Sequence, residues 1–211
     1  MTTYITFVLD ETGSMGNIKD ETISGFNKYI ETLKEELKGR TSFSLLKFDS
    51  VKLDWFVKNA SVKKVAPLSE DTYMPGAMTP LWDAVAHAIK ETEERLKGKK
   101  DPTVIFTVLT DGYENASREF NAAQVREMIE GHDDWAFNFV GAGIDAWALA
   151  ETAGFVTGSI SYTSPYQIGT AMKGISRRSA VYASANKVEQ SAMRSDFYGG
   201  KTDIGKDDDS S

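Results

Sequence analysis

The sequence contains no cysteine. This absence excludes a disulfide framework, a thiolate metal site and a cysteine nucleophile, and it is typical of a reducing compartment. The first residues, Met1–Tyr4, lack the basic region and the apolar core of a signal peptide. No apolar run approaches the length of about 20 residues that a membrane-spanning helix requires. We therefore expect a cytoplasmic protein without a membrane contact.

Basic residues are scarcer than acidic ones: there are 24 Lys and Arg against 31 Asp and Glu, which gives a formal net charge of -7. Binding to the phosphate backbone of a nucleic acid depends on clustered Lys and Arg. Here the basic pairs, such as Lys63-Lys64 and Arg177-Arg178, are scattered and are interpreted as solvated surface. We therefore expect no nucleic-acid partner.

Three short apolar runs predict the centre of the fold. They are Ile5–Leu9, Val104–Leu109 and Ala136–Val140. Such nearly continuous runs are typical of strands that are buried on both faces of a parallel sheet. Apolar residues at helical spacing lie between and after them and predict helices near residues 23–37, 81–96, 125–129 and 168–182.

Three further strands complete the predicted sheet. Ser42–Phe48 and Lys52–Val57 are too close for a crossover helix, so this pair is predicted to form an antiparallel hairpin. A last strand is expected near Phe155–Ile160. The alternation of strands and helices predicts an α/β fold with a doubly wound, Rossmann-like and mostly parallel central sheet. We expect one antiparallel edge strand and helices on both faces.

The apolar pattern fades after about Ala185, and the chain ends in a polar, acidic segment. We therefore expect one domain over residues 1–185 and a disordered tail over residues 186–211.

Polar side chains cluster where the predicted strands end. Asp10, Thr12 and Ser14 follow the first strand, Asp111 follows the strand Val104–Leu109, and Thr79 lies in a loop before a helix. Ligands bind beyond the carboxyl ends of the strands in open α/β sheets. Carboxylate and hydroxyl oxygens suit Mg²⁺, Mn²⁺ or Ca²⁺ rather than zinc or copper. The sequence therefore predicts a divalent metal site formed by these five residues.

The same residues resemble a known family. Asp-Glu-Thr-Gly-Ser-Met at 10–15, Thr79 before Pro-Leu-Trp-Asp-Ala, and Thr-Asp-Gly at 110–112 are similar to the von Willebrand factor A domain. The metal-ion-dependent adhesion site of that family is written Asp-x-Ser-x-Ser, Thr, Asp. Thr12 stands where serine is commoner but keeps the hydroxyl. The resemblance covers roughly Thr3 to Ala185, and residues 110–118 are similar to the cytosolic bacterial and phage-encoded branch.

The resemblance implies a function without bond breaking. In the family site, hydroxyls and waters fill most of the shell of the metal, and the two Asp act mostly through water. The metal stays electron-poor and accepts a Glu or Asp from a protein partner in place of a water. We therefore expect a non-enzymatic protein-binding module with no other cofactor, and the sequence sets no oligomeric state.

Other interpretations stay open for these residues. Asp10 could cap the first helix, Asp111 could be a turn residue, and Thr79 could cap the helix that begins near Leu81. A Mg²⁺-dependent hydrolase or phosphatase is the alternative function. Phosphatases of the haloacid dehalogenase type need a second Asp two residues after the nucleophile, where this chain has Thr12. A structural role without metal is a third possibility.

Two further patterns lie near the predicted strand ends. Residues 141–146 match Gly-x-Gly-x-x-Ala, a dinucleotide-binding pattern, but they lie late in the chain and are interpreted as a tight strand-to-helix turn. Met78, Trp82, Tyr113 and Glu114 are neighbours of the site residues in the sequence and could form a rim that selects a partner. The alternative for each is an ordinary loop residue.

Overall fold

A central sheet of six strands organises the computed structural model, which describes residues 2–142, 146–155, 160–194 and 197. The strand order is β3-β2-β1-β4-β5-β6. All neighbouring strands are parallel except β2 and β3, which form an antiparallel pair at one edge. The strands are β1 (Thr2–Asp10), β2 (Arg40–Phe48), β3 (Leu53–Ser61), β4 (Thr103–Thr110), β5 (Ala136–Ala142) and β6 (Ile160–Thr163).

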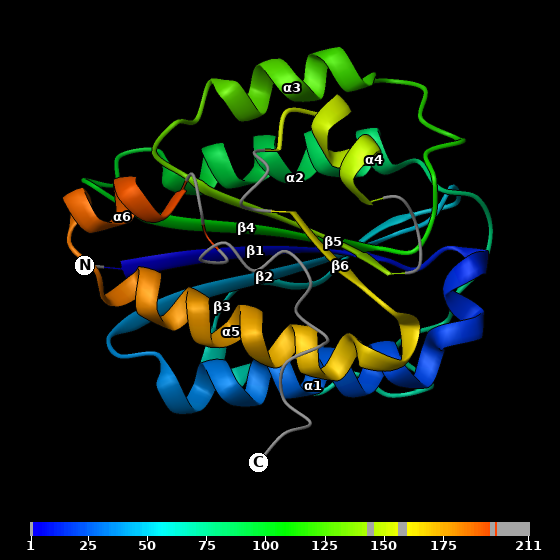
Figure 1. Cartoon of the computed structure of the whole chain (residues 1–211), viewed down its shortest axis with the longest axis horizontal. Coiled ribbons are helices and arrows are strands. Elements are labelled where there is room, and N and C mark those ends of the chain that lie inside the picture. Colours follow the sequence, from blue (N-terminus) through cyan, green and yellow to red (C-terminus); the bar gives the residue numbers. More distant parts are fainter. Residues whose placement is uncertain (1, 143–145, 156–159, 195–196, 198–211) are drawn as a thin grey trace.

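Helices cover both faces of the sheet (Figure 1). On one face lie α2 (Leu81–Leu96), α3 (Ala122–Glu130) and α4 (Ala146–Thr152), and on the other lie α1 (Lys19–Glu36) and α5 (Ile168–Ser184). Short 3₁₀ turns occur at η1 (Gly13–Ile18), η2 (Val62–Lys64) and η4 (Pro165–Gln167). The predicted α/β class, with one antiparallel edge strand and two helical layers, is confirmed.

Strand β1 shows why the centre of the sheet forms. Every residue from Thr3 to Asp10 is buried, as expected of a strand between two helical layers. Successive side chains of β1 point to opposite faces of the sheet and pack against the helices on each face. Phe7 packs edge-on against Phe26 and Tyr29 of α1, with ring centroids 5.6 and 5.1 Å apart, while Val8 joins the core under α2. Among the described helices, none combines the length and the apolar character needed to cross a membrane.

The last strand lies later in the chain than predicted. β6 begins at Ile160, whereas the strand was expected near Phe155–Ile160. Phe155 instead packs against Phe137 and Phe139 of β5, with ring centroids 6.2 and 5.2 Å apart. The apolar residue Phe155 therefore belongs to the core after α4. Residues 156–159 lie outside the described residues.

The tail predicted from residue 186 contains a further helix, α6 (Lys187–Arg194). The Asn186 side chain accepts hydrogen bonds from the backbone N–H groups of Val188 and Glu189, which starts the helix. The Gln190 amide is buried and donates to the Tyr182 and Ala185 carbonyls. Because polar groups hold α6, the apolar pattern did not reveal it.

The packed chain extends at least to Phe197, beyond the predicted boundary at residue 185. Phe197 is buried, with its ring centroid 5.9 Å from that of Tyr182. The predicted disorder of residues 198–211 lies outside the described residues.

Two truncations test this boundary. Removing residues 199–211, in which Ile204 is the only large apolar residue, should leave the melting temperature nearly unchanged. Truncation after Ala185 also removes Gln190 and Phe197 and should lower it by roughly 6–12 °C, since loss of a buried aromatic costs about 3 kcal/mol or more. Differential scanning calorimetry of both chains decides the matter. Equal melting temperatures would show that α6 adds nothing to stability.

Candidate metal centre

The five residues singled out in the sequence meet at one end of the sheet, where β1 and its neighbour β4 end. Thr12 lies after β1, Ser14 in η1, and Thr79 in the loop before α2. The Thr79 hydroxyl donates to Thr12 Oγ1 at 3.1 Å, and Thr12 Oγ1 lies 3.5 Å from Ser14 Oγ. Ser14 Oγ donates to Asp111 Oδ1 at 2.6 Å. One chain of contacts therefore links all three loops.

Burial is graded across this cluster. Asp10, Thr12 and Thr79 are buried, Asp111 is half-buried and Ser14 is exposed. The cluster therefore opens to solvent on the side of Ser14 and Asp111, where a partner could approach.

The two carboxylates are held in surroundings that disfavour their charge. Asp10 Oδ1 accepts the Thr12 backbone N–H at 2.8 Å, and Oδ2 accepts the Thr110 hydroxyl. Burial nevertheless outweighs these hydrogen bonds and raises the pKa of Asp10 to about 6, and the nearby Asp111 charge adds to the rise. Burial also raises the pKa of Asp111, against the hydrogen bond from Ser14. A cation beside both groups would favour their charged forms.

Gly112 shows that the oxygens surround one small space. A Cβ at this position would lie 3.2 Å from Thr79 Oγ1, 3.4 Å from Ser14 Oγ and 3.6 Å from Asp10 Oδ2. Three oxygens from two segments, residues 10–14 and the loop before α2, therefore face the same volume, which a glycine of a third segment leaves open. This arrangement fits a small, hard cation.

The types of donor atom in the cluster also indicate a small, hard cation. The donor set consists of two carboxylates and three hydroxyls, without nitrogen or sulfur, and so suits Mg²⁺, Mn²⁺ or Ca²⁺. Within the described ranges, no group of three or more His, Asp or Glu could hold a metal ion. No carboxylate-rich centre therefore competes with this cluster there.

The capping roles considered for Thr79 and Asp10 do not match their contacts. The first turn of α2 is capped from the loop after β4, since Trp82 N donates to Glu114 Oε2 at 3.0 Å and Asp83 N donates to Ser117 Oγ at 3.1 Å. Thr79 is therefore not the cap of α2. Asp10 does not cap α1 either, because that helix begins at Lys19 without a side-chain cap.

Glu11, which the sequence reasoning missed, fixes the frame of the cluster. Its Oε1 accepts Lys47 Nζ at 3.0 Å and Met74 N at 2.8 Å, while Oε2 lies 3.3 Å from Lys52 Nζ without hydrogen-bond geometry. Glu11 is 0% exposed and Lys47 only 3%. Lys47 Nζ also donates to the Thr72 carbonyl at 2.6 Å. The available signal was Lys47 itself, because a charge inside an apolar strand needs a buried partner.

The Thr79 loop is attached to the end of β1 by further hydrogen bonds. The Tyr73 hydroxyl donates to the Asp10 carbonyl at 2.6 Å, and Gly13 N donates to the Ala77 carbonyl at 3.1 Å. Ala77 has a φ of +60°, a left-handed conformation that is uncommon outside glycine. These hydrogen bonds therefore fix the conformation of the loop, including the left-handed residue Ala77.

Asn115 holds the backbone of Thr79 through two hydrogen bonds. Its Oδ1 accepts Thr79 N at 2.8 Å, and its backbone N–H donates to the Thr79 carbonyl at 3.1 Å. No local pattern in the sequence indicated this role, because the two residues lie in different loops.

The four candidate rim residues divide into two pairs. The Glu114 carboxylate is occupied by backbone N–H groups, and Trp82 is 6% exposed, so both serve the structure. Met78 and Tyr113 are 51% and 57% exposed and lie beside Thr79 and Gly112 in the chain. Only this second pair is available to a partner.

The raised pKa of Asp10 predicts a pH dependence in divalent-free buffer. Its ordinary value is 3.8 and its folded value about 6, so the folded chain binds the proton more tightly. This contribution to stability is fully present below about pH 4 and is lost as the pH rises through about 6, by up to about 3 kcal/mol. Asp10→Asn should remove the fall in stability that Asp10 causes as the pH rises. Urea unfolding of both proteins at pH 4.5 and 7.5 measures it, and identical pH dependence would contradict the assignment.

No protein-family model matches the chain, and no curated protein matches it. Several solved structures are similar to the chain. One is a von Willebrand factor type A protein from Catenulispora acidiphila, with a TM-score of 0.58 and 11% identity over 85% of this chain and 43% of that one. Another is the vWF domain of the type V pili tip protein Mfa5 from Porphyromonas gingivalis, with a TM-score of 0.59 and 10% identity over 88% and 97%.

A third similar structure is the manganese-loaded Plasmodium vivax TRAP protein, with a TM-score of 0.56 and 14% identity over 82% of this chain and 73% of that one. The chain spans less than half of the Catenulispora protein. At these identities the similarity shows the fold, which is that of a von Willebrand factor A domain.

Proposed function

We propose that this chain is a non-enzymatic protein-interaction module that uses a divalent cation to bind an Asp or Glu of a partner. The cation, Mg²⁺ or else Mn²⁺ or Ca²⁺, is held by Asp10, Thr12, Ser14, Thr79 and Asp111. The observation that carries the proposal is the convergence of three oxygens on the space beside Gly112. The manganese-loaded TRAP protein, which has the same fold, adds support.

Charge explains why the partner group is a carboxylate. Asp10 and Asp111 together balance one divalent cation, and the three hydroxyls add no charge. When bound, the cation supplies a Lewis-acidic position that favours an anionic oxygen over water. Ser14 and Thr79 direct their protons to Asp111 and Thr12, so their oxygen lone pairs remain for a cation. The exposed side of the cluster gives a partner access.

The enzymatic alternative lacks the second carboxylate that a haloacid dehalogenase phosphatase places two residues after its nucleophile, since this position is Thr12. Thr12 cannot replace the second carboxylate of a haloacid dehalogenase phosphatase at neutral pH. A phosphatase screen in Mg²⁺ should therefore find no activity above that of Asp10→Ala.

Retention of partners from a host lysate tests the function. Immobilised wild-type chain in Mg²⁺ should retain proteins that EDTA releases, and Asp111→Ala should retain none of them. Proteins held equally in EDTA would show that the cation has no part in binding.

Thr79 separates the proposed function from a structural role. Thr79→Ala should weaken the binding of an EDTA-released partner by about tenfold or more, because the cation that binds the partner carboxylate loses one of the residues that hold it. Mn²⁺ binding should weaken less, because four of the five residues remain. Thr79→Ser keeps the hydroxyl and should bind like wild type.

Melting temperature and partner affinity are measured together for each Thr79 variant. A purely structural Thr79 would cost about 1 kcal/mol of stability with its hydrogen bond. If stability falls in Thr79→Ala while affinity in excess Mg²⁺ stays at the wild-type level, the proposed mechanism is wrong.

A further inference from the structure

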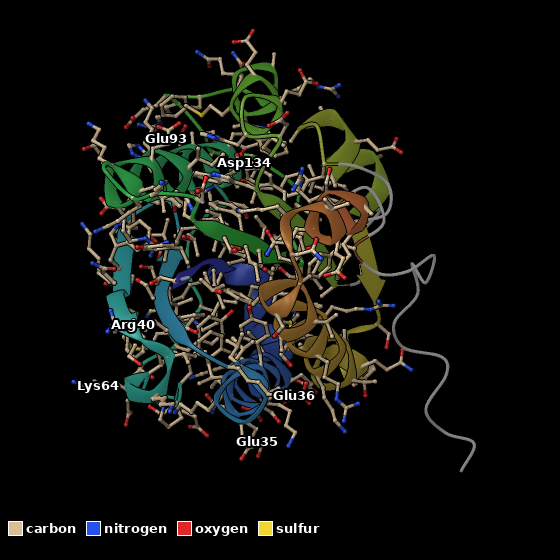
Figure 2. The ribbon with its side chains drawn as sticks, turned by 90° about the vertical axis from the view of Figure 1, so that its left-hand side faces the viewer. Glu35, Glu36, Arg40, Lys64, Glu93 and Asp134 are labelled. Carbon is tan, nitrogen blue, oxygen red and sulfur yellow. The ribbon has the colours of Figure 1, made fainter. Side chains whose placement is uncertain are left out.

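Exposed hydrophobic side chains gather at the end of the sheet that carries the candidate metal centre. Among the described residues, the exposed large hydrophobics are Val51, Leu53, Met74, Met78, Tyr113, Tyr166, Val181 and Val188. Four of the first five lie in the loops beside β1, β2 and β4 that surround the site, and Leu53 begins β3 directly after the β2–β3 turn. The opposite end of the sheet, seen in Figure 2, presents exposed charged residues such as Arg40, Glu93 and Asp134. Exposed hydrophobic patches, such as the one beside the candidate metal centre, are typical of interaction surfaces.

Part of this surface forms a groove of about 640 Å³. One wall is the β2–β3 turn with Val51 and Leu53, and the other is the loop 115–119. Met78 and Pro80 also line the groove, and Met78 N donates to Ser50 Oγ at 3.1 Å. Because Met78 precedes Thr79, the groove begins next to the candidate metal centre.

The acidic residues of the groove are occupied within the chain. Asp49 Oδ1 accepts the backbone N–H groups of Val51 and Lys52 at 2.6 and 2.9 Å. Asp83 accepts three backbone N–H groups from residues 118–120.

A third carboxylate is paired with a side chain, since Glu119 Oε2 lies 3.0 Å from His87 Nε2. Arg118 lines the same wall and is exposed. The groove therefore combines the apolar side chains of the β2–β3 turn and Met78 with two exposed basic residues, Lys52 and Arg118.

We propose that this groove binds an extended segment of the protein partner that continues from the acidic residue held at the cation. The segment places a large apolar side chain against Val51 and Met78, within about three residues of the acid, since an extended chain advances about 3.3 Å per residue. This inference rests on the proposed function. Methionine and arginine are enriched at protein interfaces, and Arg118 complements the negative charge of an acidic segment. The occupant is thus an acidic-apolar peptide of another protein.

Random linear peptides displayed on phage test the proposal. They are selected on the full-length immobilised chain in Mg²⁺ and eluted with EDTA. We expect the eluted sequences to share an Asp or Glu and a large aliphatic or aromatic residue at one constant spacing. Val51→Ser and Met78→Ser should each weaken the selected peptides by at least about fivefold. Both should keep wild-type Mn²⁺ affinity, because neither residue belongs to the oxygen cluster.

Val188→Ser is the matched control, since Val188 is 81% exposed on α6, away from the groove. It should bind the selected peptides like wild type. An acidic consensus without an apolar preference, or unchanged affinity in both groove variants, overturns the groove proposal and leaves the proposed function standing. Absence of any EDTA-eluted peptide overturns both. Mg²⁺-dependent dimers that Met78→Ser dissolves would show that a second copy is the occupant, which also overturns the proposal.

Discussion

Lys47→Met should lower the free energy of unfolding by about 3 kcal/mol, because it leaves the Glu11 carboxylate buried without its main partner. The substitution keeps the length of the side chain, so loss of packing adds little. For a chain of 211 residues this corresponds to a fall in melting temperature of roughly 6–12 °C. Lys52, which is 40% exposed in its side chain and 3.3 Å from Glu11 Oε2, cannot replace a partner that is 4% exposed.

The double variant Glu11→Gln/Lys47→Met separates charge from packing. It removes the stranded carboxylate and keeps an oxygen for Met74 N, so it should recover most of the lost stability. Urea unfolding of wild type, both single variants and the double variant completes the cycle. A double variant no more stable than Lys47→Met would show that the ion pair is not the cause.

Gly112→Ala should abolish measurable Mn²⁺ binding and leave the fold intact. Its methyl carbon would lie between 3.2 and 3.6 Å from three oxygens of the cluster and would fill the space that a cation and its waters need. Asp10→Ala and Asp111→Ala should have the same effect on binding through loss of charge. Calorimetric titration with Mn²⁺ measures all three, and circular dichroism checks the fold.

Gly16→Ala provides the matched control for the added methyl. Gly16 lies in η1 near the cluster, and a Cβ there would meet nothing within 4 Å. It should therefore bind Mn²⁺ like wild type. Wild-type affinity in Gly112→Ala would place the cation elsewhere.

The sequence predicted those parts of the fold that local patterns determine. β1, β4 and β5 are short apolar runs because both of their faces are buried, and the helices α1, α2 and α5 carry apolar residues at helical spacing. The convergence of Asp10 and Asp111 followed from topology, since parallel strands end at the same edge of a sheet. Local sequence was therefore sufficient to propose the site residues.

The remaining features depend on contacts between distant segments. Glu11 and Lys47 are 36 positions apart, as are Thr79 and Asn115, and neither pair leaves a periodic pattern. Helix α6 was missed because the buried Gln190 amide attaches it to α5. The predicted start of β6 was too early, because Phe155 packs against β5 and precedes the first residue of β6. Side-chain partners of this kind are not visible in a single sequence.

Anomalous X-ray diffraction from crystals of the wild-type chain soaked in Mn²⁺ tests the proposed cation site directly. We expect one strong manganese peak at the end of β1, in the space bounded by Ser14 Oγ, Thr79 Oγ1 and the backbone of Gly112, and we expect Gly112→Ala to lose it. A manganese peak at another site, or no peak at saturating Mn²⁺, would contradict it.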